Sequence, residues 1–86
     1  MKQAVYYTQG TCSQQINITL NDDDTIEHVE FVGGCHGNTT GISLLVKGMK
    51  AQDVISKLEG VRCGYKATSC PDQLARALRQ MLATQQ

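Results

Sequence analysis

The stretch QQINITLNDDDTIEHVEFV, residues 14–32, decides the fold of this 86-residue chain. Ile16, Ile18 and Leu20 alternate with polar residues, which is the period of a half-buried strand. The following Asn-Asp-Asp-Asp is a turn signal, and residues 25–32 resume a strand that Gly33-Gly34 ends. The stretch therefore predicts an antiparallel hairpin with Asp23 and Asp24 at its tip.

The segments on both sides of this hairpin complete a fold prediction. Residues 3–8 indicate an earlier strand, stopped by Gly10. Downstream, apolar residues recur at helical spacing and predict a first helix that Asn38 or Thr39 caps and Gly48 ends. Its predicted apolar face consists of Ile42, Leu45, Val46 and Met49.

The same spacing over residues 51–58 predicts a second helix closed by Gly60. A third helix begins at residues 69–72, where Ser69 suits the N-cap, Pro71 the first turn and Asp72 the helix dipole. Its predicted apolar face is Leu74, Leu78, Met81 and Leu82. We therefore expect one α+β domain over residues 1–86, a two-layer sandwich of a three-stranded antiparallel meander followed by three helices.

The hairpin also places two of the four cysteines. If its strands pair tightly, Ile16 lies opposite Phe31, so that apolar positions match across the strands. The same register places Cys12 opposite Cys35 at the open end of the hairpin. Because alternate residues of a strand lie on the same face, Cys12 shares the face of Ile16 and Cys35 that of Phe31, which is the face covered by helices. We therefore expect these two thiols to lie close together.

The other two cysteines lie near the third helix. Cys70 begins it, where free N–H groups and the helix dipole favour a thiolate. Cys63 lies between Arg62 and Lys66, whose charges favour a thiolate too. Four converging thiolates suit tetrahedral zinc or an iron–sulfur cluster, so the metal-ligand set expected is Cys12, Cys35, Cys63 and Cys70. Cys63 and Cys70 are alternatively a redox pair.

Composition restricts the compartment and the partners. The eight basic and eight acidic residues give a net charge of zero, which offers no electrostatic footprint for nucleic acid. The N-terminus lacks the apolar core of a signal peptide, and no apolar run is long enough to span a bilayer. We therefore expect a cytoplasmic protein with reduced thiols, bound to neither nucleic acid nor membrane.

The string TSCPD, residues 68–72, matches letter for letter the motif that names the TSCPD domain, and the resemblance covers nearly the whole chain. Such domains form a C-terminal segment of cobalamin-dependent ribonucleotide reductases and also occur as small stand-alone proteins. The resemblance implies an accessory module of ribonucleotide reduction, with a ribonucleotide reductase or a thioredoxin-like protein as partner. At 86 residues the chain is too short to hold the reductase catalytic domain.

A more distant likeness links the chain to iron–sulfur scaffold proteins of the NifU/IscU type. Cys12, the segment Gly34-Cys35-His36-Gly37 and the segment Cys70-Pro71-Asp72-Gln73-Leu74-Ala75 resemble the places of that family's three ligand cysteines. Gln14 stands where that family has an aspartate, and Cys63 has no counterpart. The likeness implies the same fold and a cluster-binding site.

Simpler alternatives stay open at each position. A cysteine often packs as a small hydrophobe, and His36 is a ligand, a proton carrier or a solvated loop residue. A Cys12–Cys35 or Cys63–Cys70 disulfide is disfavoured in a reducing cytosol. Three functions therefore compete: a thiol-redox accessory module, a zinc or iron–sulfur binding module, and a plain interaction domain that recruits a partner through its helical face or sheet edge.

Overall fold

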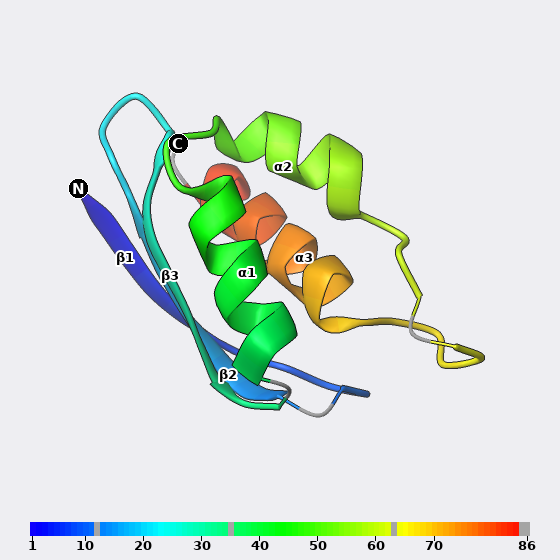
Figure 1. Ribbon diagram of the computed structural model, residues 1–86. Coiled ribbons are helices and arrows are strands. Elements are labelled where there is room, and N and C mark those ends of the chain that lie inside the picture. The colour runs from blue at the N-terminus through cyan, green and yellow to red at the C-terminus, as the bar shows by residue number, and fades with distance from the viewer. Residues whose placement is uncertain (12, 35, 63, 85–86) are drawn as a thin grey trace.

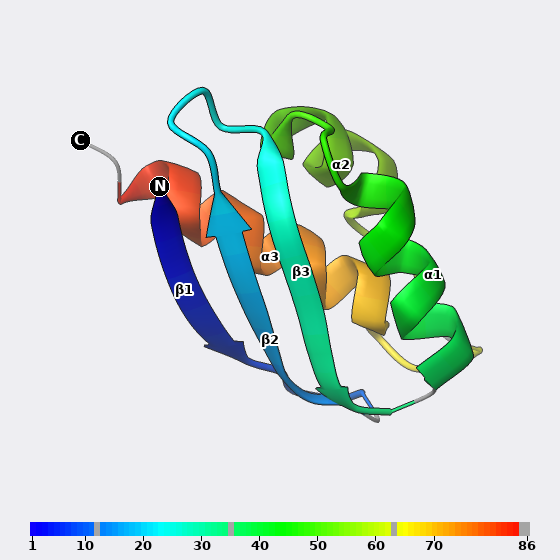
Figure 2. The same ribbon diagram turned by 60° about the vertical axis from the view of Figure 1, so that its left-hand side comes forward.

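The fold is a three-stranded antiparallel sheet followed by three helices, as predicted. The computed structural model describes residues 1–11, 13–34, 36–62 and 64–84. The sheet has the order β1-β2-β3, and the helices lie against one of its faces (Figures 1 and 2). The elements are β1 (Lys2–Tyr7), β2 (Ser13–Leu20), β3 (Ile26–Gly33), α1 (His36–Val46), α2 (Ala51–Leu58) and α3 (Cys70–Ala83).

The core lies between the sheet and α3, which crosses behind the sheet in Figure 2. The alternating apolar residues of β2 are fully buried: Ile16 and Leu20 are 0% exposed and Ile18 is 1% exposed. From α3, Leu74 and Leu78 are both 0% exposed. Each such side chain contributes about 1.5–3 kcal/mol through burial. The predicted inner faces of β2 and α3 are thus confirmed, with Arg76 and Arg79 of α3 outward as expected.

The hairpin register is confirmed in its middle and shifts at both ends. Ile16 pairs with Phe31, as predicted. An irregularity between Ser13 and Gln15 then changes the register, so that Ser13 pairs with Gly33 and is buried. Because a bulge reverses the alternation of faces, the predicted register and parity do not extend beyond Gln15. The expected pairing of Cys12 with Cys35 lies outside the described residues.

The chain leaves β3 through two glycines in a left-handed conformation. Gly33 has a φ of 80° and Gly34 a φ of 83°, values that L side chains rarely adopt. This agrees with the prediction that Gly33-Gly34 ends the strand. The sharp turn sends the chain back along β3 as α1 (Figure 1).

Two expectations for α1 are wrong. The helix begins at His36, so Asn38 and Thr39 lie inside it and neither is its cap. Leu45, assigned to the buried face, is 77% exposed, whereas Val46 is 5% exposed. Because α1 lies along the edge strand β3, the sheet covers only a narrow strip of the helix, and Leu45 stays outside that strip.

Candidate functional site at the start of helix α3

The residues of the TSCPD motif occupy the start of α3, where two connecting segments reach the helix. One is the β1–β2 connection, residues 8–12, of which residues 8–11 are described, and the other is the α2–α3 connection, residues 59–69, described apart from Cys63. Polar side chains of α3 hydrogen-bond to described residues of both segments. The first turn of α3 therefore joins parts of the chain that lie far apart in the sequence.

Ser69 is the N-cap of α3, which confirms the prediction. Its backbone is extended, with φ −152° and ψ 170°, and its Oγ accepts a hydrogen bond from the backbone N–H of Asp72 over 3.2 Å. The same hydroxyl donates to the backbone carbonyl of Val61 over 2.6 Å. One side chain therefore both caps the helix and holds the incoming segment against it.

Asp72 is a buried carboxylate that is approached by three hydrogen-bond donors. The backbone N–H of Gly60 donates to Oδ1 over 2.7 Å, the hydroxyl of Thr68 donates to Oδ2, and Nε of Arg76 lies 3.0 Å from Oδ2. Burial by itself raises the pKa of Asp72, but the hydrogen bonds from Thr68 and Gly60 and the charge of Arg76 outweigh it. The pKa of this carboxyl is therefore held below its ordinary value of 3.8.

Gln73 links α3 to the β1–β2 connection. Its Nε2 donates to Oγ1 of Thr68 over 3.0 Å, and its Oε1 accepts from the backbone N–H of Gln9 over 3.1 Å. Gly10 follows with a φ of 75°, and a Cβ there would lie 3.1 Å from Cγ2 of Thr68. The backbone thus approaches the motif closely at a residue without a side chain.

Sequence reasoning missed the roles of Thr68 and Gln73 and assigned Asp72 only to the helix dipole. A signal was present, because residues 72 and 73 are both polar and directly precede the apolar face of the helix. Both are 1% exposed. A buried polar pair in a first turn indicates partners elsewhere in the chain, although it does not identify them.

Cys70 is the one cysteine among the described residues, and its thiol is free and half-buried. Its Sγ lies 3.3 Å from Oγ of Ser13, which in turn lies 3.1 Å from Oγ1 of Thr11. The thiol of α3 therefore contacts the start of β2, across the interface between the two layers.

The remaining members of the predicted thiol site fall outside the described part of the chain. Cys12, Cys35 and Cys63 lie there, as does the side chain of His36. The described residues alone contain no group of three or more histidine, cysteine, aspartate or glutamate side chains that could hold a metal. The four-cysteine ligand set and the Cys63–Cys70 redox pair therefore stay predictions.

The fold and this site define a small two-layer α+β domain that presents a cysteine at the start of its last helix. The chain matches the model of the TSCPD domain family over residues 2–82 and belongs to that family. No curated protein and no solved structure matches it. The more distant likeness to NifU/IscU scaffold proteins is not supported. No helix in the described ranges is both long and apolar enough to cross a bilayer.

Proposed function

We propose that this protein is an accessory thiol module of ribonucleotide reduction, with Cys70 as its central sulfur. The proposal rests on membership of the TSCPD family and on the resemblance of the chain to the TSCPD segment at the C-terminus of cobalamin-dependent ribonucleotide reductases. In this proposal the domain supplies thiol chemistry to a larger partner.

One observation supports the proposal most directly: the polar side chains of the motif make hydrogen bonds within the fold. Ser69 and Asp72 use their side chains to hold backbone groups of Val61 and Gly60, and Thr68 bonds to Asp72. The sulfur of Cys70 has one hydrogen-bond partner among the described residues, the hydroxyl of Ser13. Structural roles therefore account for the polar members of the motif, and Cys70 is the member that brings reactive chemistry.

In the metal-binding form of the proposal, Cys70 is a ligand together with Cys12, Cys35 and Cys63. Thiolates are the ligands that zinc and iron–sulfur clusters prefer, and a small domain gains folding free energy from such a site. The chemistry of Cys70 fits this use, because its sulfur is half-buried and next to a hydroxyl that can donate to a thiolate.

In the redox form, Cys63 and Cys70 reduce a disulfide of the reductase by thiol–disulfide exchange. Two cysteine thiols form one disulfide, and the two electrons and two protons they release convert the partner's disulfide to two thiols. A thioredoxin-like dithiol then restores the pair. This cycle requires a compartment where thiols stay reduced, such as the cytoplasm.

Elemental analysis of anaerobically purified protein tests the metal-binding form. We expect about one zinc or one iron–sulfur cluster per chain, and loss of the metal in Cys70→Ser. Ser13→Ala is the matched control, because it removes the neighbouring hydroxyl and keeps the thiol. Metal-free protein, or full metal content in Cys70→Ser, contradicts this form.

Maleimide trapping after diamide treatment tests the redox form. We expect Cys63 and Cys70 to be protected from maleimide by disulfide formation and to become reactive again after treatment with reduced thioredoxin, whose dithiol is oxidised in the exchange. A ribonucleotide reductase assay with thioredoxin as reductant then compares the wild type with Cys70→Ser. Three results together would show that the proposed function is wrong. The purified protein carries no metal, both thiols stay free after diamide treatment, and addition of the protein does not change reductase turnover.

A further inference from the structure

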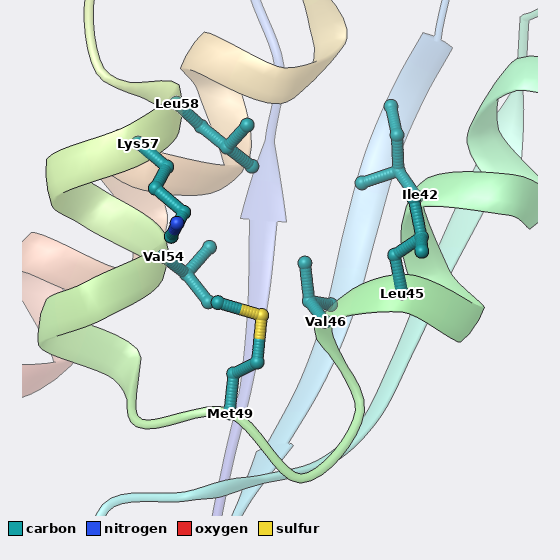
Figure 3. A pocket seen from close by; sticks show the side chains of 7 residues that line it. All are labelled: Ile42, Leu45, Val46, Met49, Val54, Lys57 and Leu58. Atoms are coloured by element: carbon teal, nitrogen blue, oxygen red, sulfur yellow. The ribbon is translucent and has the colours of Figure 1, made fainter.

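An apolar groove of about 160 Å³ lies between α1 and α2, away from the motif. Ile42 and Val46 line it from α1, Val54 and Leu58 from α2, and the thioether of Met49 stands between the two helices (Figure 3). The one charged lining group is the amine of Lys57. The groove thus offers an apolar floor with a single cation.

The apolar surface continues beyond the groove. Leu45 lies on its α1 side and is 77% exposed. An exposed leucine next to a groove contributes little to the stability of the domain that carries it. Exposed apolar surface that adjoins an apolar groove is typical of an interaction site.

The charges around the groove restrict what can cover it. Lys47 and Lys57 form no ion pair with any described residue. Asp53, one turn before Lys57 on α2, forms none either, and Glu59 is held by Arg79 at 2.7 Å. A partner that places a carboxylate beside the amine of Lys57, which has no ion-pair partner in the described part of the chain, is electrostatically complementary to the groove.

We propose that this groove binds an amphipathic helix of a partner protein that carries acidic residues beside its apolar face. Apolar side chains of that helix at positions i, i+3 and i+4 fill the groove and cover Leu45, and an acidic residue meets Lys57. The eight residues of α2 span about 12 Å, which matches about two turns of the bound helix. This site is independent of the thiol chemistry proposed above.

A displayed library of helical peptides tests the proposal without knowledge of the partner. The library fixes leucine at i, i+3, i+4 and i+7 and randomises the flanking positions among Asp, Glu, Lys and Arg. We expect selection on the wild-type protein to enrich Asp and Glu beside the leucine face. Selection on Lys57→Glu serves as the comparison, with Lys66→Glu, a lysine outside the groove, as the matched control.

Fluorescence titration of a selected peptide gives the affinities. Lys57→Glu should weaken an acidic peptide by about three- to tenfold and strengthen its lysine counterpart, while Leu45→Ala weakens both. Lys66→Glu and Cys70→Ser should leave the affinity unchanged. Absence of enrichment, or enrichment of Lys and Arg, overturns the proposal. So does a dimer in sedimentation that Leu45→Ala dissociates, because a second copy would then cover the groove.

Discussion

The backbone N–H of Gly60 donates a 2.7 Å hydrogen bond to Oδ1 of Asp72, which attaches the segment after α2 to the first turn of α3. Ser69 makes a second attachment through the carbonyl of Val61, and Gln73 makes a third through the N–H of Gln9. The first turn of α3 is therefore a structural junction next to the thiol of Cys70.

Asp72→Asn should lower the free energy of unfolding at pH 7 by about 2–3 kcal/mol, since it weakens three interactions of a buried carboxylate. Because the pKa of Asp72 is held below 3.8, its stabilisation is complete above that value and is lost as pH falls towards the folded-state pKa. Urea denaturation between pH 7 and pH 2.5 should therefore show a weaker pH dependence in the variant. The exposed Asp53→Asn is the control, and equal acid sensitivity in Asp72→Asn and wild type would contradict the prediction.

Ser69→Ala should destabilise the protein by about 1–2 kcal/mol, because it removes the N-cap of α3 together with the hydrogen bond to Val61. Ser69→Thr keeps a hydroxyl at the same place and should recover most of the loss. The measurement is the midpoint of urea unfolding for both variants. An unchanged midpoint in Ser69→Ala would show that the cap contributes nothing here.

Gly10→Ala should cost about 1–2 kcal/mol, because the φ of 75° is unfavourable for alanine and the new Cβ would lie 3.1 Å from Thr68. Gly37→Ala, inside α1 with no atom within 4 Å of the added carbon, should instead stabilise the protein by about 0.5–1 kcal/mol. Opposite signs of the two changes in thermal unfolding are the expected result. A tolerated alanine at residue 10 would refute the close approach of the β1–β2 connection.

Leu78→Ala should reduce stability by about 2–5 kcal/mol, since Leu78 is 0% exposed and its loss leaves a cavity under the sheet. Leu45→Ala, at 77% exposure, should change stability by less than about 0.5 kcal/mol. Denaturant titration of the two variants measures both effects. A similar loss in both would mean that Leu45 is covered in solution.

If the thiols bind a metal, a chelator should lower the melting temperature of the wild type and leave that of Cys70→Ser unchanged. The reason is linkage, because a ligand that binds only the folded state stabilises it. The melting temperature with and without EDTA is the measurement. Equal sensitivity of both proteins would argue against Cys70 as a ligand.

The sequence predicted the sheet well because a strand with one buried face has a strict period of two residues. The alternation of apolar residues alone was therefore enough to pair Ile16 with Phe31. The register shift next to Ser13 was missed, since neither Gln14 nor Gln15 carries a local bulge signal. The start of α1 was misplaced for a similar reason, because Asn38 and Thr39 are typical caps that occur inside this helix.

The site was predicted only where local rules apply. Ser69 was identified as a cap because capping is decided within four residues. The contacts of Gln73 with Gln9 and of Cys70 with Ser13 join residues 64 and 57 positions apart, and no local pattern encodes them. Leu45 is exposed because α1 lies along the edge strand β3 and the sheet covers only a strip of the helix, an arrangement that the spacing of apolar residues does not specify.

The meander order of the sheet has a consequence for how the chain folds. Its two hairpins connect neighbouring segments, so they close short loops at small entropic cost, and we expect them to form first. The contacts of the last helix with Ser13 and Gln9 span 57 and 64 positions, so they close longer loops and we expect them to form later. The step that completes the native state thus also assembles the surroundings of the thiol, so a chain stalled before this step has a sheet and lacks the described sulfur environment.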